Sequence, residues 1–471
     1  MRNQGLCKII LIFTFVIFTL KVSFGGFPGA GTCHARYNFS VEEERRLGER
    51  FEKELENHLQ LIKDPSIQGY IDRIGKKITS QIDYKPFDFN FHVYVASDPN
   101  AFAIPAGYIY ISSGLIIMAE NESELAGVIS HEIAHVTARH IAEKIEKERK
   151  LSIGTLAAIL AGLFLGGSGK AAGAIGAFSM ATAQTLSLKY TRENEEEADR
   201  LGLGYLIGAG YDGSGLIGFL EKMKRHRLQV YQIPQYLLTH PEAETRVDYL
   251  DVMLRRFPKQ KEPEGMIEGF QRMQVKVMVH SRSPEHAREY FESALESNPG
   301  RSDLIYGLAL ANQKLGNYDE AIEGLNQALT IYPDDSEILS NLGVCHFFEG
   351  RTDNAISALE RSVANDQRNT YALYYLGRSY QEKGRFKEAI KVYNKLKRLN
   401  TNHIDVYYNL GVAYGKAGHM GESHRNFGTF FKLKNKWDSA LFHFNRALKY
   451  YSNDTKEKRE ILREIKMIKG K

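Results

Sequence analysis

Two histidines and a glutamate stand at metal-site spacing in GVISHEIAHVTARHIAEK, residues 127–144. His131 and His135 are four residues apart, so both imidazoles leave the same face of a helix. Glu132 is rotated by about 100° from His131, so it borders a metal on that face and could act as general base without binding the metal. The alternative is three polar residues on a solvent-exposed face. His140 is expected to face another direction and is interpreted as structural.

A hydrolytic zinc site needs three protein ligands and one open position. Ala138 and Ile141 stand where the metzincin motif needs glycine and histidine, so the third ligand must come from elsewhere. The acidic stretch YTRENEEEADRLGLGYL, residues 190–206, places Glu195 and Asp199 on one helix face. Glu195 can be the third ligand, and Asp199 can fix the tautomer of a ligand histidine. A solvated acidic helix start is the alternative.

The motifs HEIAHVTARH, RENEEEADRLG and LTHPEAETRV resemble, in order and spacing, the M48 family of zinc metallopeptidases. The resemblance implies one zinc ion per chain, held by His131, His135 and Glu195. It also implies that His240 of the third motif lies at the active site. Two roles are open for His240: a latency plug in the fourth zinc position, or a catalytic group that stabilises an oxyanion. A surface His-Pro turn is the alternative.

The elements that must position these residues indicate one M48-like domain over residues 26–256. We expect a zincin-like α+β metallopeptidase fold, mostly helical with a small β-sheet. FDFNFHVYV (87–95) alternates strictly and predicts a half-buried strand, and YIYISSG (108–114) predicts a second one. DPNAFAIPAG (98–107) is interpreted as the connection between them. Asn121 is placed to cap the helix that carries the two histidines.

A second domain is predicted at residues 268–454, after a charged, proline-containing linker at 257–267. The recurring positions include Gly316, Gly350, Gly384 and Gly418. Their period of 34 is that of tetratricopeptide repeats, which pair antiparallel helices and stack the pairs into an all-α solenoid. A basic C-terminal helix at 455–471 is expected to be a solvated cap.

The first 25 residues predict a secretory signal peptide with a positive start and a short apolar core, IILIFTFVIFTL. An uncleaved anchor is the alternative. The expected location is therefore the periplasm. The apolar segment 151–184 is either a lid over the catalytic domain or a contact with a membrane surface. Cys33 and Cys345 are too far apart in sequence for a disulfide to be inferred.

Charge excludes one class of partner. Arg2, Lys8 and Lys21 lie in the first 25 residues, which contain no acid, and removing them lowers the net charge from +5 to +2. The remaining chain is thus near neutral, and no nucleic-acid partner is expected.

The leading hypothesis is a zinc endopeptidase of the cell envelope whose strand at 108–113 pairs with an extended substrate. The whole chain resembles the periplasmic type of M48 protease that enhances β-barrel assembly. That resemblance implies unfolded or misassembled outer-membrane β-barrel clients, with the repeat array recruiting clients or the assembly machinery. The alternative is a catalytically silent tetratricopeptide scaffold or chaperone-like binding protein. Glu132 argues for activity, because an inert descendant would not need it.

Overall fold

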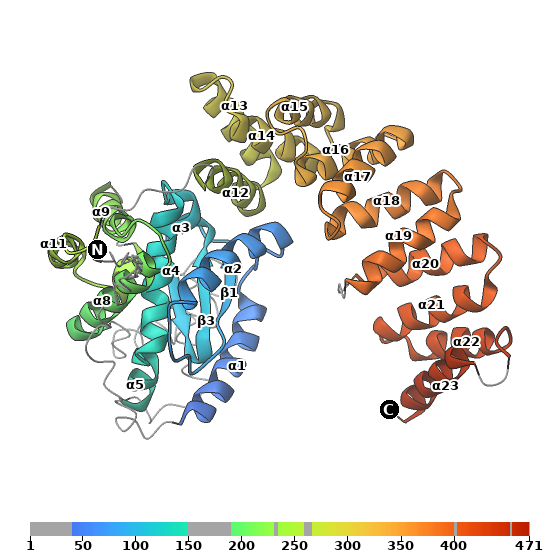
Figure 1. Ribbon diagram of the computed structural model, residues 1–471, viewed down its shortest axis with the longest axis horizontal. Helices are drawn as coiled ribbons and strands as arrows, with labels where there is room; N and C mark the ends of the chain where they lie inside the picture. The colour runs from blue at the N-terminus through green and yellow to red at the C-terminus, as the bar shows by residue number, and fades with distance from the viewer. Residues whose placement is uncertain are drawn as a thin grey trace, which may run out of the picture.

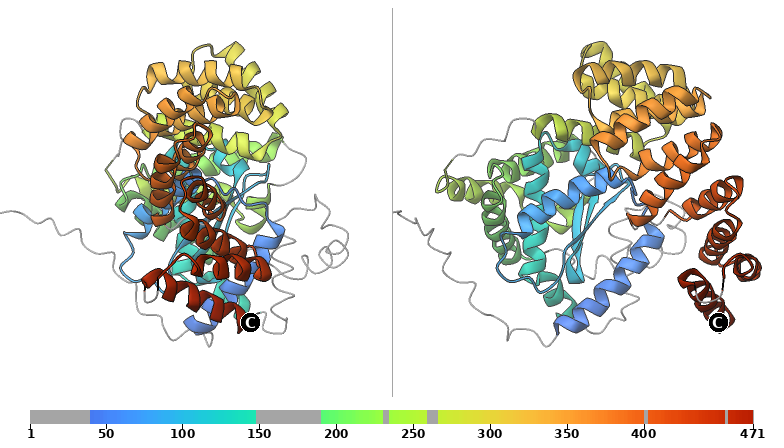
Figure 2. Two further views of the ribbon diagram at one scale, coloured as in Figure 1. Left: turned by 90° about the vertical axis from the view of Figure 1, so that its right-hand side faces the viewer. Right: turned by 45° about the vertical axis from the view of Figure 1, so that its right-hand side comes forward.

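The computed structural model describes residues 40–147, 190–229, 234–258, 266–399, 403–452 and 455–470. A small sheet and its helices form the first part, and an array of helix pairs follows and curves beside it (Figure 1, Figure 2). The predicted fold class, a mostly helical α+β domain followed by an all-α array, is confirmed. The expected signal peptide (1–25) and the apolar segment 151–184 lie outside the described residues. No described helix is long and apolar enough to cross a membrane.

The first part is a three-stranded sheet surrounded by helices. Its strands are β1 (Asn90–Tyr94), β2 (Ala101–Ile104) and β3 (Tyr108–Ser112). Its helices are α1 (Val41–His58), α2 (Pro65–Thr79), α3 (Ser113–Met118), α4 (Glu122–Thr137), α5 (His140–Lys147), α8 (Arg192–Gly208), α9 (Ser214–Gln229), α10 (Gln235–Thr239) and α11 (Ala243–Leu254). A 3-10 turn, η1 (Pro105–Gly107), joins β2 to β3.

The segment between the two predicted strands differs from the prediction, because it contains a third strand. The order of the sheet is β1-β3-β2, with β1 parallel and β2 antiparallel to β3. The stretch 98–107 is therefore not only a connection, because it contains β2. All four residues of β2 are buried, so the stretch lacks the polar–apolar alternation that marks a half-buried strand. The β3 strand is central, and the edges of the described sheet are β1 and β2.

Helix α4 is the buried core of the first part. The Asn121 side chain accepts a hydrogen bond from the Glu124 backbone N–H at its start, as the sequence indicates. Every residue from Glu122 to Val136 is buried, so the polar residues of this helix are enclosed by protein. Helix α8 packs closely on it at Gly202, where a Cβ would lie 3.1 Å from the Cα of His131. A side chain at this position would push the two helices apart by a few tenths of an ångström, which glycine avoids.

The array repeats one helical hairpin. Its helices are α13 (Pro284–Ser297), α14 (Ser302–Leu315), α15 (Tyr318–Ile331), α16 (Ser336–Phe348), α17 (Thr352–Asn365), α18 (Thr370–Glu382), α19 (Phe386–Arg398), α20 (Asp405–Lys416), α21 (Met420–Leu433), α22 (Trp437–Leu448) and α23 (Lys456–Lys469). The glycines that recur every 34 residues, Gly316, Gly350, Gly384 and Gly418, have φ of 82°, 73°, 70° and 84°. Each ends the first helix of a pair in the left-handed backbone that glycine favours.

Helix α12 (Met266–Ser281) belongs to both parts of the molecule. Phe270, Met273 and Val277 pack into the hydrophobic core of the first part. The core of the array begins on the same helix, because Val275, Met278 and Val279 pack against the array helices. The helix is therefore a shared wall between the two cores (Figure 1).

Ion pairs reinforce this junction. The Lys276 ammonium on α12 is buried and lies 3.0 Å from Oδ1 of Asp64, the N-cap of α2, and it also contacts Glu337 on α16. The neighbouring Arg272 lies 2.5 Å from Asp335, the N-cap of α16. Charged side chains at the start of α2, on α12 and at the start of α16 thus form ion pairs with one another at the junction.

Candidate metal centre

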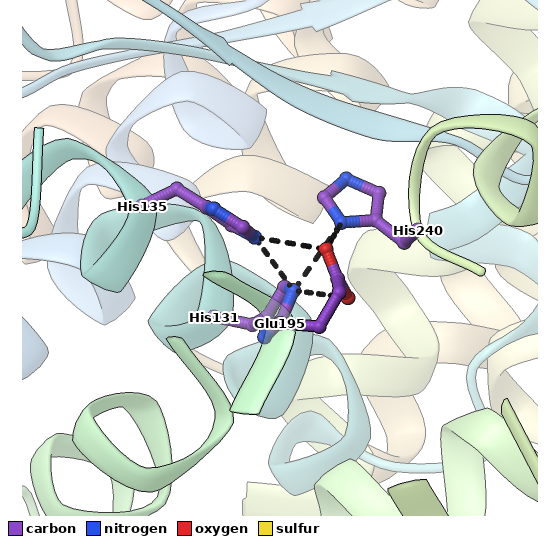
Figure 3. A group of neighbouring side chains, drawn as sticks. All are labelled: His131, His135, Glu195 and His240. Atoms are coloured by element: carbon purple, nitrogen blue, oxygen red, sulfur yellow. Dashed lines mark hydrogen bonds and ion pairs between the residues drawn. The ribbon is translucent and has the colours of Figure 1, made fainter. Parts of the chain in front are cut away.

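Four potential ligands converge beside α4. His131 and His135 come from that helix, Glu195 from α8, and His240 from the residue after α10 (Figure 3). One ligand atom from each of the four lies within 4.8 Å of the others, and all four residues are buried. The structure thus brings together the three residues expected to bind zinc and adds His240 as a fourth.

The interatomic distances suit a tetrahedral metal. The Nε2 atoms of His131 and His135 are 3.0 Å apart, and they lie 3.5 and 3.4 Å from the nearer oxygens of Glu195. Nδ1 of His240 lies 2.9 Å from Glu195 Oε1 and 3.3 Å from His131 Nε2. Ligands on a tetrahedron with bonds of 2.0–2.1 Å to zinc would lie roughly 3.3–3.4 Å apart.

Asp199 lies behind His131. Its Oδ1 is 2.8 Å from His131 Nδ1. A proton on Nδ1 therefore hydrogen-bonds to a carboxylate, which leaves the lone pair on Nε2 directed toward the other ligands. Burial alone would raise the pKa of Asp199, but Arg246 and His131 outweigh it and lower that pKa below its ordinary value.

Arg246 on α11 is a component that the sequence reasoning missed. Its guanidinium is buried and makes a two-pronged pair with Asp199, with Nε–Oδ2 of 2.8 Å and Nη2–Oδ1 of 2.7 Å. Nη1 lies 2.6 Å from Glu195 Oε2. Arg246 thus fixes a candidate ligand and the carboxylate behind another. The available signal was its place in LTHPEAETRV, six residues after His240.

Glu132 is buried beside the ligands without being one of them. Neither of its carboxylate oxygens accepts a hydrogen bond of ordinary geometry within the described structure. Burial raises the pKa of Glu132 to about 8, although the backbone N–H of Ala103 on β2 faces the carboxylate and acts to lower it. His240 Nε2 lies 3.4 Å from Glu132 Oε1. A basic carboxylate of this kind suits proton transfer near neutral pH.

The charge of the site fits a divalent cation. Three buried carboxylates, Glu132, Glu195 and Asp199, face one buried guanidinium, Arg246. With neutral histidines, the ionised site has a formal excess of two negative charges. Lone pairs of imidazole nitrogens also converge at 3.0 Å, which is unfavourable unless a cation or a proton lies between them. Three imidazoles and one carboxylate form a donor set that zinc prefers.

Aromatic rings close the site. Tyr190 stacks on His135 with a centroid distance of 3.8 Å, and Tyr236 stacks on His240 at 4.6 Å. Both tyrosines are buried.

The orientation of His140 differs from the prediction. Its ring does not face away from the site, because its Nδ1 lies 2.9 Å from Nδ1 of His135.

Three regions of the chain match known families. Residues 65–254 match Peptidase family M48, and residues 301–368 and 377–418 match tetratricopeptide repeats. A Yersinia pestis protein named beta-barrel assembly-enhancing protease is 30% identical over 62% of this chain and 61% of its own length. Its namesake in Escherichia coli K12 is 33% identical over 47% of this chain and 45% of its own length.

Two further matches cover less than half of this chain. The mitochondrial metalloendopeptidase OMA1 of Schizosaccharomyces pombe is 29% identical over 46% of this chain and 64% of its own length. The crystal structure of MamA protein matches 36% of this chain and 95% of its own at 22% identity, with a TM-score of 0.32. The chain spans less than two thirds of the length of the first curated relatives that it matches.

Proposed function

The chain carries an M48 peptidase domain followed by tetratricopeptide repeats, and we propose that it is a zinc-dependent endopeptidase of the cell envelope. The convergence of His131, His135 and Glu195 beside the buried Glu132 carries this proposal. A catalytically silent scaffold would need neither the complete donor set nor a buried carboxylate with a raised pKa next to it.

The residues of the candidate metal centre would have different roles in peptide hydrolysis. His131, His135 and Glu195 would hold one zinc ion, which when bound supplies Lewis-acid activation of water and of the scissile carbonyl. Glu132 accepts a proton at its carboxylate and later passes it to the leaving amine. Asp199 and Arg246 keep His131 and Glu195 in position. Tyr190 covers the ring of His135 and Tyr236 covers the ring of His240, which would limit the access of water to both rings.

The substrate backbone would add to the edge of β2 that does not face β3. The expectation that the strand at 108–113 pairs with substrate is wrong, because β3 already pairs with β1 and β2. The β2 strand has one neighbour within the described sheet, and its Ala103 faces the Glu132 carboxylate. An extended segment that hydrogen-bonds to this edge would lie beside the general base. Such pairing depends on hydrogen bonds to the main chain of the substrate. It would therefore select unfolded segments without requiring one particular sequence.

His240 would hold the resting enzyme latent. Its Nδ1 occupies the position of a fourth ligand, while its Nε2 faces the general base Glu132 at 3.4 Å. The ring of His240 would therefore keep water from the fourth position on the metal. It would also keep substrate away from the Glu132 carboxylate. This geometry supports the latency plug over the oxyanion role, since an oxyanion donor must leave the fourth position free.

The names of the relatives suggest a class of client and a location for this chain. Two relatives are named beta-barrel assembly-enhancing proteases. We propose that this chain acts in the periplasm, where it degrades or helps assemble misfolded outer-membrane β-barrel proteins. The repeat array would recruit unfolded or misassembled clients, or the outer-membrane assembly machinery.

A digestion experiment tests the function. The purified full chain is loaded with zinc and incubated with an unfolded outer-membrane β-barrel protein, with and without a chelator. We expect cleavage that the chelator abolishes and that zinc restores. A folded, soluble protein serves as the control substrate and should resist. Absence of cleavage by the zinc-loaded chain and by its His240→Ala variant would contradict the proposed activity.

A further inference from the structure

The helix that carries the ligand histidines breaks just before His140. Helix α4 ends at Thr137, and Arg139 has a left-handed φ of 57°. In an unbroken helix, His140 would lie about 140° around the axis from His135. The turn at Arg139 instead directs the chain back toward the ligands. Arg139 is held in this strained conformation by two contacts to the buried Glu44 of α1, at 2.8 and 2.9 Å.

The turn places His140 directly behind His135. The two Nδ1 atoms are 2.9 Å apart, and His140 is 2% exposed. On its other side, Nε2 of His140 lies 3.3 Å from Oε2 of Glu197, which is half-exposed on α8. The imidazole therefore connects a carboxylate near the surface with a candidate metal ligand.

Metal binding through Nε2 of His135 would set the direction of these hydrogen bonds. Nε2 of His135 faces His131 and Glu195, so the lone pair belongs on Nε2 and the proton on Nδ1. His135 then donates from Nδ1 to Nδ1 of His140. His140 is left with its proton on Nε2, from which it donates to Glu197. All three groups are satisfied by this one arrangement.

We propose that His140 is a positioning residue that fixes the tautomer and ring orientation of His135 for metal binding. The inference rests on the proposed metal site and deepens it. His131 is supported by the carboxylate of Asp199, whereas His135 is supported by an imidazole with a carboxylate behind it. A hydrogen bond to the non-ligating nitrogen holds the ring and raises its basicity as a ligand.

Metal binding by the full chain tests the role without relying on proteolysis. His140→Leu removes the acceptor, and His140→Asn keeps an amide oxygen near the position of Nδ1. His92→Leu is the matched control, because His92 is a partly buried histidine that stacks on Tyr110 away from the site. Zinc affinity is measured by competition with a chelator, and the visible spectrum is recorded with cobalt in place of zinc.

We expect His140→Leu to lower zinc affinity by about 10–100-fold and to shift the cobalt bands. His140→Asn should retain most of the affinity, and His92→Leu all of it. Wild-type affinity and spectrum in His140→Leu, or an equal loss in the Leu and Asn variants, would overturn the proposal. If every variant binds zinc as expected but none cleaves, the proposed protease function fails and the positioning role stands.

A measurement on the unmodified protein covers the case in which His140→Leu does not fold. In the zinc-loaded chain with ¹⁵N-labelled histidine, a hydrogen bond between two nitrogens produces a scalar coupling across it. We expect this coupling between the Nδ1 atoms of His135 and His140. A His135 ring that carries its proton on Nε2 would overturn the proposal.

Discussion

Nε2 of His240 lies 3.4 Å from Oε1 of Glu132, while Nδ1 of the same ring lies 2.9 Å from Oε1 of Glu195. One imidazole therefore touches both the candidate base and a candidate ligand. Stacking on Tyr236 holds the ring in this position. If His240 is the proposed latency plug, a peptide can reach the base and the fourth ligand position only after the ring has moved.

His240→Ala should raise the basal cleavage of an unfolded client, because it vacates the fourth ligand position and frees Glu132. Zinc should remain bound by His131, His135 and Glu195. Cleavage rate and zinc content are measured on the same preparation. Tyr236→Phe is the control, since it keeps the stacked ring. A clear drop in cleavage with zinc content unchanged would show that His240 is a catalytic group instead of a plug.

Glu132→Gln should keep about one zinc per chain and reduce cleavage by roughly 10²–10⁴-fold, because a general base is lost and the ligands remain. Glu195→Ala is the matched comparison and should lose the metal along with the activity. Elemental analysis and client digestion distinguish the two variants. Cleavage at the wild-type rate by Glu132→Gln would remove Glu132 from the mechanism.

The parts of the site that the sequence predicts are those set by a single helix. His131 and His135 share a face because of their spacing, and so do Glu195 and Asp199 on the next helix. The contact of His140 with His135 was not predictable in this way, since it depends on a left-handed residue at position 139. Helical periodicity assumes that a helix continues, and here it stops.

Long-range packing accounts for the other differences. Arg246 joins Asp199 and Glu195 across 47 and 51 positions of sequence, and an arginine on a helix is ordinarily solvated. All four residues of strand β2 are apolar and buried, so its sequence lacks the alternation of polar and apolar residues that marks a half-buried strand. Helix α12 packs against two cores at once, whereas the sequence prediction divided it between the linker (257–267) and the repeat domain (268–454). Each feature depends on a partner distant in the chain.

Arg246→Met should destabilise the metal-free protein by about 3–5 kcal/mol, because it leaves the buried carboxylates of Asp199 and Glu195 without their cation. Adding Asp199→Asn removes one of the stranded charges. The double variant should therefore lose less stability than the sum of the two single losses. Urea unfolding of all four proteins measures this. Strict additivity would contradict direct coupling between the two residues.

A chain that ends at residue 256 should be less stable than one that ends at 281. The shorter chain lacks Phe270, Met273 and Val277, whose side chains fill the core of the first part. Burying an apolar side chain of this size contributes about 1.5–3 kcal/mol, and truncation removes that contribution for each of the three. Thermal unfolding and zinc content of the two truncated chains provide the comparison. Equal stability would show that α12 contributes nothing to the first core.

Asp64→Asn should loosen the junction in a pH-dependent way. The asparagine can still cap α2, because its amide oxygen can accept from the backbone N–H groups of Ser66 and Ile67, as Asp64 Oδ1 does. The substitution therefore isolates the charge that faces Lys276 and His280. At pH 7 we expect a loss of roughly 1.5–3 kcal/mol in the free energy of unfolding, the range for hydrogen bonds to charged groups.

The sign of the pH dependence follows from the pKa of Asp64. Burial acts to raise that pKa, but His280, Lys276 and the cap hydrogen bonds outweigh it and hold the pKa well below its usual value. A lowered pKa stabilises the folded chain above the unfolded pKa of about 3.9, and this stabilisation is lost as the pH falls further. The difference between wild type and Asp64→Asn should therefore be constant near neutrality and shrink below about pH 4. Urea unfolding of the metal-free proteins across this range measures it, and a difference that grows on acidification would contradict the ion pair.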